Sequence, residues 1–331
     1  MKPKLLVLEL WGLGDLVIAT PFLRAAVEKY EVSLLAQPFA AALRPRFWPE
    51  VEVLPFTAPW TVFHHKYQLW RWPWRKLSRL RRQLMERQFD YGVSARWDPR
   101  NHLLLKLSGA RERFGYPRMG SQRFLTRSLT RPAPLSHRLE HWRVAGQALG
   151  LDLPSRETAF PSPPTLFPAV LVHTGAKTRV RVWPLDHYRE IIRRLRQQGF
   201  PVRVVCDPDQ LDWWRNQGEK VRCPRTIADL LDLLDECGVF IGNDSGPGHL
   251  AAACGRPTFT LFGPQLHEWF APLHPASEVM EGKGCPYKPC SDYCRFAEPF
   301  CLWDITVEDV WPRVSDFVAK NLKAETGGLK S

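Results

Sequence analysis

Residues 239–255, VFIGNDSGPGHLAAACG, constrain the fold of this 331-residue chain more than any other stretch. An apolar run, residues 239–241, leads into a glycine-rich turn, and an alanine-rich segment follows. This order predicts a buried strand, a tight turn and the start of a helix. Glycines let the backbone approach a ligand, and the unbonded N–H groups at a helix start point towards it. The stretch therefore predicts an anion site, with a plain capped connection between strand and helix as the alternative.

Short apolar runs alternate with helical segments along both halves of the chain. Such runs occupy residues 5–10, 32–36, 169–172, 202–205 and 258–262. This alternation predicts an α/β fold with parallel sheets. The length predicts two domains, and five prolines within residues 152–169 indicate a stiff linker between them. We expect domains at 1–155 and 156–305, and a terminal helix within 306–331 that packs back towards the first domain.

A second glycine turn, Gly12-Leu13-Gly14-Asp15, follows the apolar run of residues 5–10. A strand, a G-x-G turn and a helix begin a βαβ unit, but the third glycine of the dinucleotide fingerprint is missing. The helix is expected over 16–30, where Pro21 either kinks it or marks a late start. Asp15 stands where a carboxylate would face the crevice at the carboxyl end of a strand. Capping of the following helix is an equally good role for it.

The net charge of +12 comes from the first half of the chain. Residues 1–155 carry 25 Lys and Arg against 12 Asp and Glu, whereas residues 156–331 carry 21 against 22. Such an asymmetry predicts that the first half faces a polyanion. Nucleic acid, an anionic membrane surface and a phosphorylated acceptor are the candidates.

Within that half, residues 60–82 hold six aromatic and seven Lys or Arg side chains, without an acid between Glu52 and Glu86. Aromatic rings beside cations suit a membrane interface or a phosphorylated amphiphile, and they also suit stacking on single-stranded nucleic acid. A solvated basic helix with tryptophans on its inner face is the alternative, and it accounts poorly for residues 70–74. A second basic patch follows, formed by Arg111, Arg113, Arg118, Arg123, Arg127 and Arg131.

Four of the eight cysteines cluster near the end of the chain, at Cys285, Cys290, Cys294 and Cys301. Their spacing matches no standard zinc finger, so a loop with packed thiols is favoured over a zinc site. The first ten residues lack the features of a signal peptide, and no run of 18 apolar residues occurs. We therefore expect a cytoplasmic protein without disulfides.

Five features, taken in order, resemble glycosyltransferase family 9, the ADP-heptose:lipopolysaccharide heptosyltransferases. They are Gly12-Leu13-Gly14-Asp15 with Thr20-Pro21; the stretch 80–116 with Ser108-Gly109-Ala110 and Arg113; His137 opening a helix; His173-Thr174-Gly175-Ala176 leading to Trp183-Pro184; and Asp244-Ser245-Gly246-Pro247-Gly248-His249 with Phe262-Gly263-Pro264. The cysteine-rich loop resembles the heptosyltransferase II branch. The resemblance spans nearly the whole chain.

The resemblance implies the GT-B fold, in which two Rossmann-like parallel-sheet domains face each other across a cleft. In this family the C-terminal domain binds the nucleotide sugar, here ADP-heptose. The N-terminal domain binds the acceptor, a phosphorylated lipid A-core anchored in the inner membrane, which agrees with the charge distribution. The resemblance thus implies a cytoplasmic enzyme that is peripheral at the anionic inner face of the inner membrane. It implies no cofactor, no metal requirement and no nucleic-acid partner.

The implied reaction is an inverting transfer in which a carboxylate removes the proton of the acceptor hydroxyl while ADP departs. Asp15 aligns with the family's proposed base. Arg181 stands where many members have Lys, and His249 either contacts phosphate or packs under the loop. The resemblance places the donor diphosphate at Lys177, Arg181, Asp244, Ser245, Gly246, Gly248 and His249, where cations and a helix start would stabilise it.

The remaining site assignments are coarser. The donor nucleotide is expected at Thr174 and Asp209, and the acceptor at Gly14, Arg96, Asp98 and Arg118. Two alternatives remain open: a related transferase that uses another sugar nucleotide, and a non-catalytic nucleic-acid-binding protein. The second alternative gives the anion site at 242–255 no role.

Overall fold

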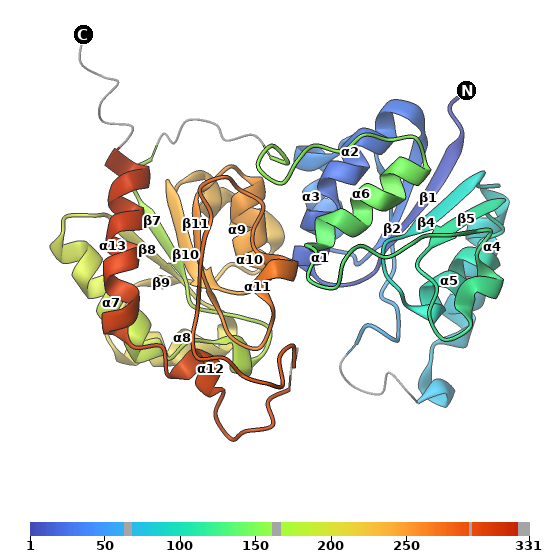
Figure 1. Ribbon diagram of the computed structural model, residues 1–331. Coiled ribbons are helices and arrows are strands. Elements are labelled where there is room, and N and C mark those ends of the chain that lie inside the picture. The colour runs from blue at the N-terminus through green and yellow to red at the C-terminus, as the bar shows by residue number, and fades with distance from the viewer. Residues whose placement is uncertain (63–67, 161–166, 291–292, 324–331) are drawn as a thin grey trace, which may run out of the picture. The chain divides into compact units, whose positions relative to one another are not determined.

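The computed structural model describes residues 1–62, 68–160, 167–290 and 293–323 (Figure 1). The chain divides into two compact units, Met1–Pro154 and Ser155–Ser331, each with its own parallel sheet. The division lies at the first proline of the predicted linker. Some residues used in the sequence predictions lie outside the described ranges: Phe63, Lys66 and Tyr67 of the aromatic run, Pro161, Pro163 and Pro164 of the linker, and 324–331 of the terminal segment.

A six-stranded parallel sheet in the order β3-β2-β1-β4-β5-β6 forms the centre of the first unit. Its strands are β1 (Lys4–Glu9), β2 (Glu31–Ala36), β3 (Glu52–Pro55), β4 (Tyr91–Ser94), β5 (Glu112–Gly115) and β6 (Arg127–Ser128). Leu5 to Leu8 of β1 are fully buried, because a central parallel strand is covered on both faces. The strand order reverses between β1 and β4, as in doubly wound nucleotide-binding folds.

Helices cover both faces of this sheet (Figure 1). α2 packs with α6 on one face, and α4 packs with α5 on the other. The helices are α1 (Leu13–Ile18), α2 (Thr20–Lys29), α3 (Ala40–Phe47), α4 (Trp74–Glu86), α5 (Pro99–Leu107) and α6 (Arg138–Ala148), with short 3-10 turns η1 (Leu69–Arg71) and η2 (Ser121–Phe124).

The single helix predicted over 16–30 is two helices. α1 begins at Leu13 and ends at Ile18, and α2 begins at Thr20 with Pro21 in its first turn. Proline is tolerated there because the first N–H groups of a helix have no partner within it. Pro21 therefore marks a late helix start, the second of the two roles expected for it.

The second unit repeats the topology, with the sheet order β12-β11-β10-β7-β8-β9. Its strands are β7 (Val170–His173), β8 (Val202–Val205), β9 (Val221–Arg222), β10 (Val239–Asn243), β11 (Thr258–Phe262) and β12 (Glu278–Glu281). Its helices are α7 (Leu185–Gln197), α8 (Leu211–Asn216), α9 (Ile227–Asp235), α10 (Gly246–Ala253), α11 (His267–Phe270), α12 (Phe300–Trp303) and α13 (Val307–Lys323), with η3 (Arg179–Arg181) and η4 (Pro208–Gln210). The strand order reverses between β7 and β10, and the α/β fold with two parallel sheets is confirmed.

The terminal helix α13 completes the core of the second unit. Its buried residues Val310, Val314 and Phe317 join the cluster that contains Val172 and Ile191. The apolar face at i, i+4 and i+7 meets α7 and the sheet of its own unit. That this helix also packs back towards the first domain stays a prediction.

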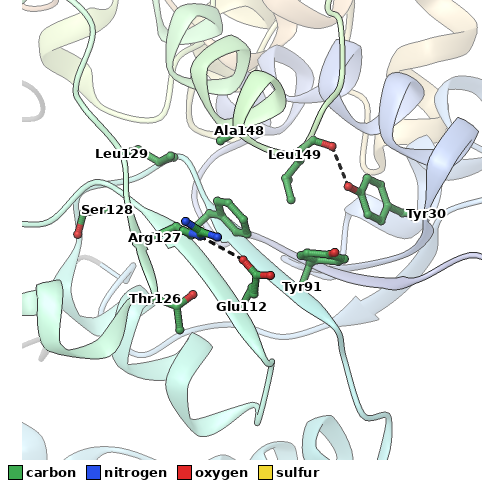
Figure 2. Close-up of a pocket in the computed structure, with 10 residues that line it drawn as sticks. Tyr30, Tyr91, Glu112, Thr126, Arg127, Ser128, Leu129, Ala148 and Leu149 are labelled. Atoms are coloured by element: carbon green, nitrogen blue, oxygen red, sulfur yellow. Dashed lines mark hydrogen bonds and ion pairs between the residues drawn. The ribbon is translucent and has the colours of Figure 1, made fainter.

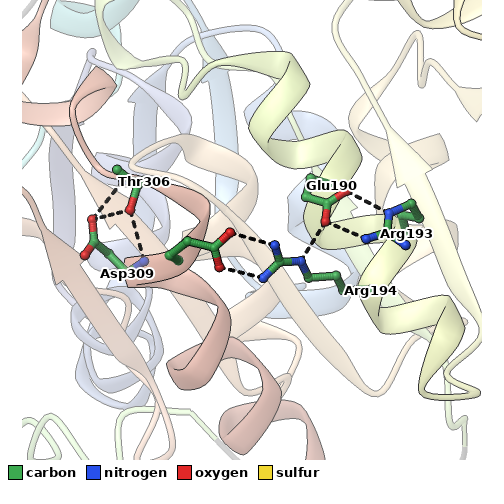
Figure 3. Close-up of polar contacts among 6 residues, drawn as sticks. Glu190, Arg193, Arg194, Thr306 and Asp309 are labelled. Atoms are coloured by element: carbon green, nitrogen blue, oxygen red, sulfur yellow. Dashed lines mark hydrogen bonds and ion pairs between the residues drawn. The ribbon is translucent and has the colours of Figure 1, made fainter.

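Polar contacts fix the start of α13 (Figure 3). Thr306 and Asp309 form reciprocal capping bonds, Thr306 N–H to Asp309 Oδ2 at 3.0 Å and Asp309 N–H to Thr306 Oγ1 at 3.2 Å. On α7, Arg194 donates to Glu190 and, through two bonds of 2.8 and 2.7 Å, to Glu308 of α13. Within the described part of the chain, no helix is long and apolar enough to cross a membrane.

Candidate functional site

The strand order brings two pairs of loops together, one pair in each unit. In the first unit β1 pairs with β4, so the loops after these strands meet at the carboxyl edge of the sheet. In the second unit β7 pairs with β10, and their following loops meet in the same way. Each pair lies where the strand order reverses, which is where open α/β sheets bind ligands. The residues predicted from the two glycine turns lie at these two points.

In the first unit, Asp15 forms an ion pair with Arg96. Arg96 Nη2 contacts Asp15 Oδ1, and each side chain is 19% exposed. Asp15 Oδ2 accepts the Gly12 N–H at 3.3 Å, which closes the first turn of α1. One oxygen of Asp15 therefore caps the turn and the other contacts the cation. The structure brings together two predicted residues, Asp15 and Arg96, that are far apart in the sequence.

Two charged side chains that were not predicted face this ion pair. Glu9, the last residue of β1, is 2% exposed, and Trp11 N–H donates to its Oε1 at 3.3 Å. Burial, opposed by the nearby Arg96, raises the pKa of Glu9 to about 7. Arg138 begins α6, where burial and the neighbouring Arg96 lower its pKa to about 9.

A buried polar network holds the main chain around Arg96. Ser94 Oγ accepts from Arg96 N–H at 3.4 Å and from Asn101 Nδ2 at 3.2 Å. Trp60 Nε1 donates to Asn101 Oδ1 at 3.1 Å, and His102 Nε2 lies 3.1 Å from the Arg96 carbonyl oxygen. Buried polar groups that are mutually bonded define one geometry. The network therefore fixes the position from which Arg96 reaches Asp15.

The other residues expected at the acceptor site have local roles. Gly14 lies within α1. Asp98 caps α5, since its Oδ1 accepts Arg100 N–H at 2.9 Å, and it also pairs with the Arg100 side chain at 2.7 Å. Arg118 is exposed, and its N–H donates to Ser121 Oγ at 2.9 Å. No described contact joins Asp98 or Arg118 to Asp15 directly.

In the second unit, Asn243 at the end of β10 links the loops after β7 and β10 through hydrogen bonds. Its Oδ1 accepts Trp183 N–H at 3.0 Å and Tyr188 O–H at 2.9 Å. Its Nδ2 donates to the carbonyl oxygens of Thr174 at 2.9 Å and Gly175 at 3.3 Å. Asn243 is fully buried. A residue that was predicted only as part of a glycine turn is therefore the centre of the local structure.

The predicted diphosphate residues surround the start of α10. Ser245 precedes the helix, and its Oγ has no hydrogen-bond partner among the described residues although the atom is buried. Gly246 and Gly248 lie in the first turn, where backbone N–H groups lack partners within the helix. Arg181 contacts Asp244, with Nη1 3.4 Å from Oδ2. His249 is 5% exposed within the helix.

A carboxylate at Asp244 would repel a phosphate. Its side chain is 5% exposed and lies beside the Arg181 guanidinium. The structure therefore gives Asp244 a way to orient Arg181, rather than a direct contact with an anion. Lys177 is exposed in the loop after β7.

The structure places Thr174 in the core. Its Oγ1 donates to Gln210 Oε1 at 2.8 Å and accepts from Trp214 Nε1 at 3.2 Å, and the side chain is fully buried. It is therefore not positioned to contact a nucleotide directly. Asp209 is exposed in η4, after β8.

Asp207 is a residue of this edge that sequence reasoning missed. A Cβ on Gly175 would lie 2.2 Å from Asp207 Oδ2, so any larger residue at this position would force the carboxylate to move. His173 Nε2 lies 3.9 Å from Asp207 Oδ1. Burial raises the pKa of Asp207 and lowers that of His173. Two acidic residues, Asp207 and Asp209, follow the apolar run 202–205, and the sequence prediction names only Asp209.

The clustered cysteines are unpaired thiols. Burial raises the pKa of Cys301 to about 11, and the neighbouring Cys290, Cys285 and Cys294 add to the effect. Among the described residues, no group of three or more His, Cys, Asp or Glu side chains could hold a metal ion.

A pocket of about 610 Å³ opens in the first unit, at the end of the sheet opposite to Asp15 and Arg96 (Figure 2). Tyr91 and Glu112, the first residues of β4 and β5, line it together with Tyr30. Arg127 pairs with Glu112 at 3.3 Å, and Tyr30 O–H donates to the Leu149 carbonyl oxygen at 2.7 Å. None of the predicted site residues lines this pocket. It lies at the amino ends of the strands, away from the edge where α/β sheets bind substrates.

Comparison with known proteins was consistent across sequence and structure. The model of glycosyltransferase family 9 (heptosyltransferase) matches residues 77–298. Lipopolysaccharide heptosyltransferase 1 of Pseudomonas aeruginosa is 30% identical over 174 residues, which are 48% of this chain and 44% of that protein. The chain thus spans less than half the length of this relative.

Two solved structures share the fold. The Escherichia coli heptosyltransferase WaaC, solved with ADP, has a TM-score of 0.71 at 18% identity and covers 95% of this chain and 99% of its own. A family 9 glycosyltransferase from Veillonella parvula has a TM-score of 0.75 at 17% identity, with coverage of 97% and 98%. These likenesses support the GT-B class of two Rossmann-like domains that was expected from the sequence.

Proposed function

Because this chain belongs to glycosyltransferase family 9, the heptosyltransferases, we propose that it transfers heptose from ADP-heptose to the phosphorylated inner core of lipopolysaccharide, with inversion at the anomeric carbon. One observation carries the proposal: each unit places charged side chains at its own topological switch point. Asp15 and Arg96 occupy the first, and Arg181 and the start of α10 occupy the second. The E. coli relative solved with ADP supports an adenine nucleotide as part of the donor.

The second unit binds the donor in this proposal. The diphosphate lies at the start of α10, where the N–H groups and the positive end of the helix dipole face it. Ser245 Oγ, which has no hydrogen-bond partner in the described part of the chain, donates a further hydrogen bond to a phosphate oxygen. Arg181, oriented by Asp244, and Lys177 stabilise the charge that develops on ADP as it departs. Protein groups supply this stabilisation, and no bound cofactor is part of the proposal.

The first unit supplies the base and binds the acceptor. A carboxylate oxygen of Asp15 takes the proton of the acceptor hydroxyl as that oxygen attacks the anomeric carbon. The bond from this carbon to the ADP oxygen breaks on the opposite face, which inverts the configuration. Arg96 holds the base in place and, with Arg138, offers positive charge to the phosphorylated acceptor.

The test of this function is release of ADP from ADP-heptose that depends on a heptose-deficient lipopolysaccharide acceptor. We expect Asp15→Asn to lower kcat at least 100-fold, because general-base catalysis contributes roughly 10²–10⁴-fold. Glu28→Gln is the matched control, since Glu28 is an exposed carboxylate of the same unit. A folded Asp15→Asn protein with full turnover would refute the assignment of Asp15 as the general base.

A second candidate is a related transferase that uses another sugar nucleotide, because the contacts at α10 would suit any nucleoside diphosphate. Thermal denaturation with ADP-, UDP- and GDP-sugars separates the two. Stabilisation by ADP-heptose alone supports the donor proposed here, whereas stabilisation confined to a UDP-sugar refutes it.

We also propose that the protein binds the anionic surface of the inner membrane at its cytoplasmic face. The contact is made by α4 and the turn before it. Trp70 is 76% and Trp74 is 55% exposed. Arg75, Arg79 and Arg82 follow at helical spacing and are exposed. Exposed indole rings beside cations suit the headgroup region of an anionic bilayer.

Co-sedimentation with vesicles tests this partner. The protein is expected to bind phosphatidylglycerol vesicles and not phosphatidylcholine vesicles. Replacement of Arg75, Arg79 and Arg82 by Glu is expected to abolish binding, whereas Arg189→Glu on the second unit leaves it unchanged. Equal binding by both variants would exclude α4 as the membrane contact, and binding to single-stranded DNA with a steep salt dependence would favour nucleic acid instead.

A further inference from the structure

The pocket in Figure 2 is a cavity that the proposed reaction does not use. Its volume of about 610 Å³ is within the range of roughly 300–1,000 Å³ that is typical of small-molecule sites. It lies at the amino ends of β4, β5 and β6, and the ends of α2 and α6 close it. Asp15 and Arg96 follow the carboxyl ends of strands in the same sheet. The pocket is therefore separate from the proposed catalytic site within one unit.

The strand register turns four side chains towards this pocket. β4 pairs with β5 so that Tyr91 is opposite Glu112, and β5 pairs with β6 so that Phe114 is opposite Arg127. Partners in a parallel register point to the same face of a sheet, and so do residues two apart in a strand, such as Glu112 and Phe114. The backbone therefore fixes the four side chains on one face, and all four line the pocket.

Aromatic rings form one wall of the pocket. The centroid of the Tyr91 ring is 5.4 Å from that of Tyr30, at an interplanar angle of 76°, and 6.3 Å from that of Phe114, at 44°. Tyr30 O–H donates to the Leu149 carbonyl oxygen at 2.7 Å, which fixes the position of its ring. The wall therefore offers apolar ring faces in fixed positions. These three rings include no parallel pair between which a flat aromatic ligand would stack.

One carboxylate and one guanidinium lie beside this wall. Of the ten described residues that line the pocket, only Glu112 and Arg127 are charged, and Arg127 Nε lies 3.3 Å from Glu112 Oε2 (Figure 2). The Glu112 and Arg127 side chains are 41% and 67% exposed, so a ligand can reach both. Within the described part of the chain, no contact engages Glu112 Oε1 or the two Arg127 Nη atoms. The pair therefore presents hydrogen-bond acceptors and donors side by side, without net charge.

This combination of groups selects one class of ligand. A phosphate would need an excess of positive charge and an amine an excess of negative charge, whereas the pair is neutral. A sugar ring has an apolar face of C–H groups that packs on aromatic rings, and its neighbouring hydroxyls both donate and accept hydrogen bonds. We propose that this pocket is a non-catalytic saccharide-binding site, in which a pyranose packs on Tyr91 and its vicinal hydroxyls bond Glu112 and Arg127. The site does not depend on the proposed transferase function.

NMR titration of the whole protein with free oligosaccharides of glucose, galactose, mannose and heptose tests the site. At least one is expected to bind, whereas its O-methylated form, which lacks hydroxyl donors, is not. Tyr91→Leu removes the ring but keeps apolar bulk, and Arg127→Ala truncates a largely exposed side chain. Each is expected to weaken binding at least about tenfold. Tyr293→Leu and Arg111→Ala change exposed residues outside the pocket and are expected to bind as wild type does.

Each other outcome overturns the proposal. Binding of none of the oligosaccharides removes the site, and unchanged affinity in both pocket variants places the sugar elsewhere. Binding of adenosine, spermidine or inorganic phosphate that depends on Tyr91 and Arg127, without binding of a sugar, refutes the ligand class. Acceptor-dependent ADP release is measured separately, and Arg127→Ala is expected to keep wild-type turnover. A fall in turnover that parallels the loss of sugar binding would make the pocket part of the catalytic site.

Discussion

Replacing Asn243 by Leu tests whether one buried amide organises the donor side of the protein. Leucine has the same branched arrangement of four heavy side-chain atoms, so the change removes the hydrogen bonds without creating a cavity. Trp183 N–H and Tyr188 O–H lose their acceptor, and the Gly175 carbonyl oxygen loses its donor. The Thr174 carbonyl oxygen keeps a bond from Gln210 Nε2 at 3.1 Å.

The energetic cost follows from these three groups, which the substitution leaves without a hydrogen-bond partner. A buried polar group left without a partner costs about 1–3 kcal/mol, so we expect a loss of about 4 kcal/mol in the free energy of unfolding of the second unit. In a domain of this size that corresponds to a fall in Tm of about 8–16 °C. The loops after β7 and β10 also lose their link, so the affinity for ADP-heptose is expected to fall with stability.

Thermal and urea denaturation of three variants measure the effect. Tyr188→Phe removes one hydroxyl and leaves Asn243 bonded to Trp183, so it is expected to cost about 1 kcal/mol. Asn216→Leu makes the same chemical change at an exposed position and is expected to stay within about 0.5 kcal/mol of wild type. The reasoning is refuted if Asn243→Leu costs no more than Tyr188→Phe.

Three further changes have defined outcomes. Glu9→Gln is expected to stabilise the first unit increasingly as pH rises. Burial raises the pKa of Glu9 from 4.5 to about 7, so the stability that the Glu9 carboxyl contributes is complete below pH 4.5 and is lost as pH rises through 7, a difference of about 3 kcal/mol. Equal Tm differences between variant and wild type at pH 4.5 and pH 8 would contradict this. Gly175→Ala places a methyl group against Asp207 and is expected to weaken ADP binding, measured by calorimetry, about tenfold. Gly284→Ala is the control and is expected to leave the affinity unchanged, because a Cβ there meets nothing within 4 Å. Equal affinities of the two variants for ADP would show that Asp207 does not position the loop after β7. Glu308→Ala breaks the exposed pair with Arg194 and is expected to leave the midpoint of urea denaturation nearly unchanged, because water screens exposed ion pairs. A large fall in that midpoint would show that the pair anchors α13.

The parts of the fold that depend on local pattern were predictable from the sequence. Apolar runs separated by glycine turns identified β1 and β10, and the proline-rich segment located the division near Pro154. Both glycine turns lie at switch points because such turns are the local requirement for a strand that ends beside a ligand. Pro21 similarly marked the start of α2.

Contacts between distant residues were not predictable in the same way. The pairing of Asp15 with Arg96 depends on β1 and β4 being neighbours, and nothing local in the sequence sets that strand order. Thr174 lies in a glycine turn, but the partners that bury its hydroxyl, Gln210 and Trp214, come from another segment. Glu9 interrupts an apolar run, which was a visible signal; its meaning depends on the charges that three other segments bring to it.

The position of α13 has a consequence for how such proteins diversify. Because this helix closes the core of the second unit, each unit is one uninterrupted length of chain, with a single covalent junction near Pro154. One recombination event at that point in the gene would exchange a whole unit without cutting either hydrophobic core. If the first unit selects the acceptor and the second the donor, new pairings of acceptor and sugar arise by a single crossover rather than by many substitutions.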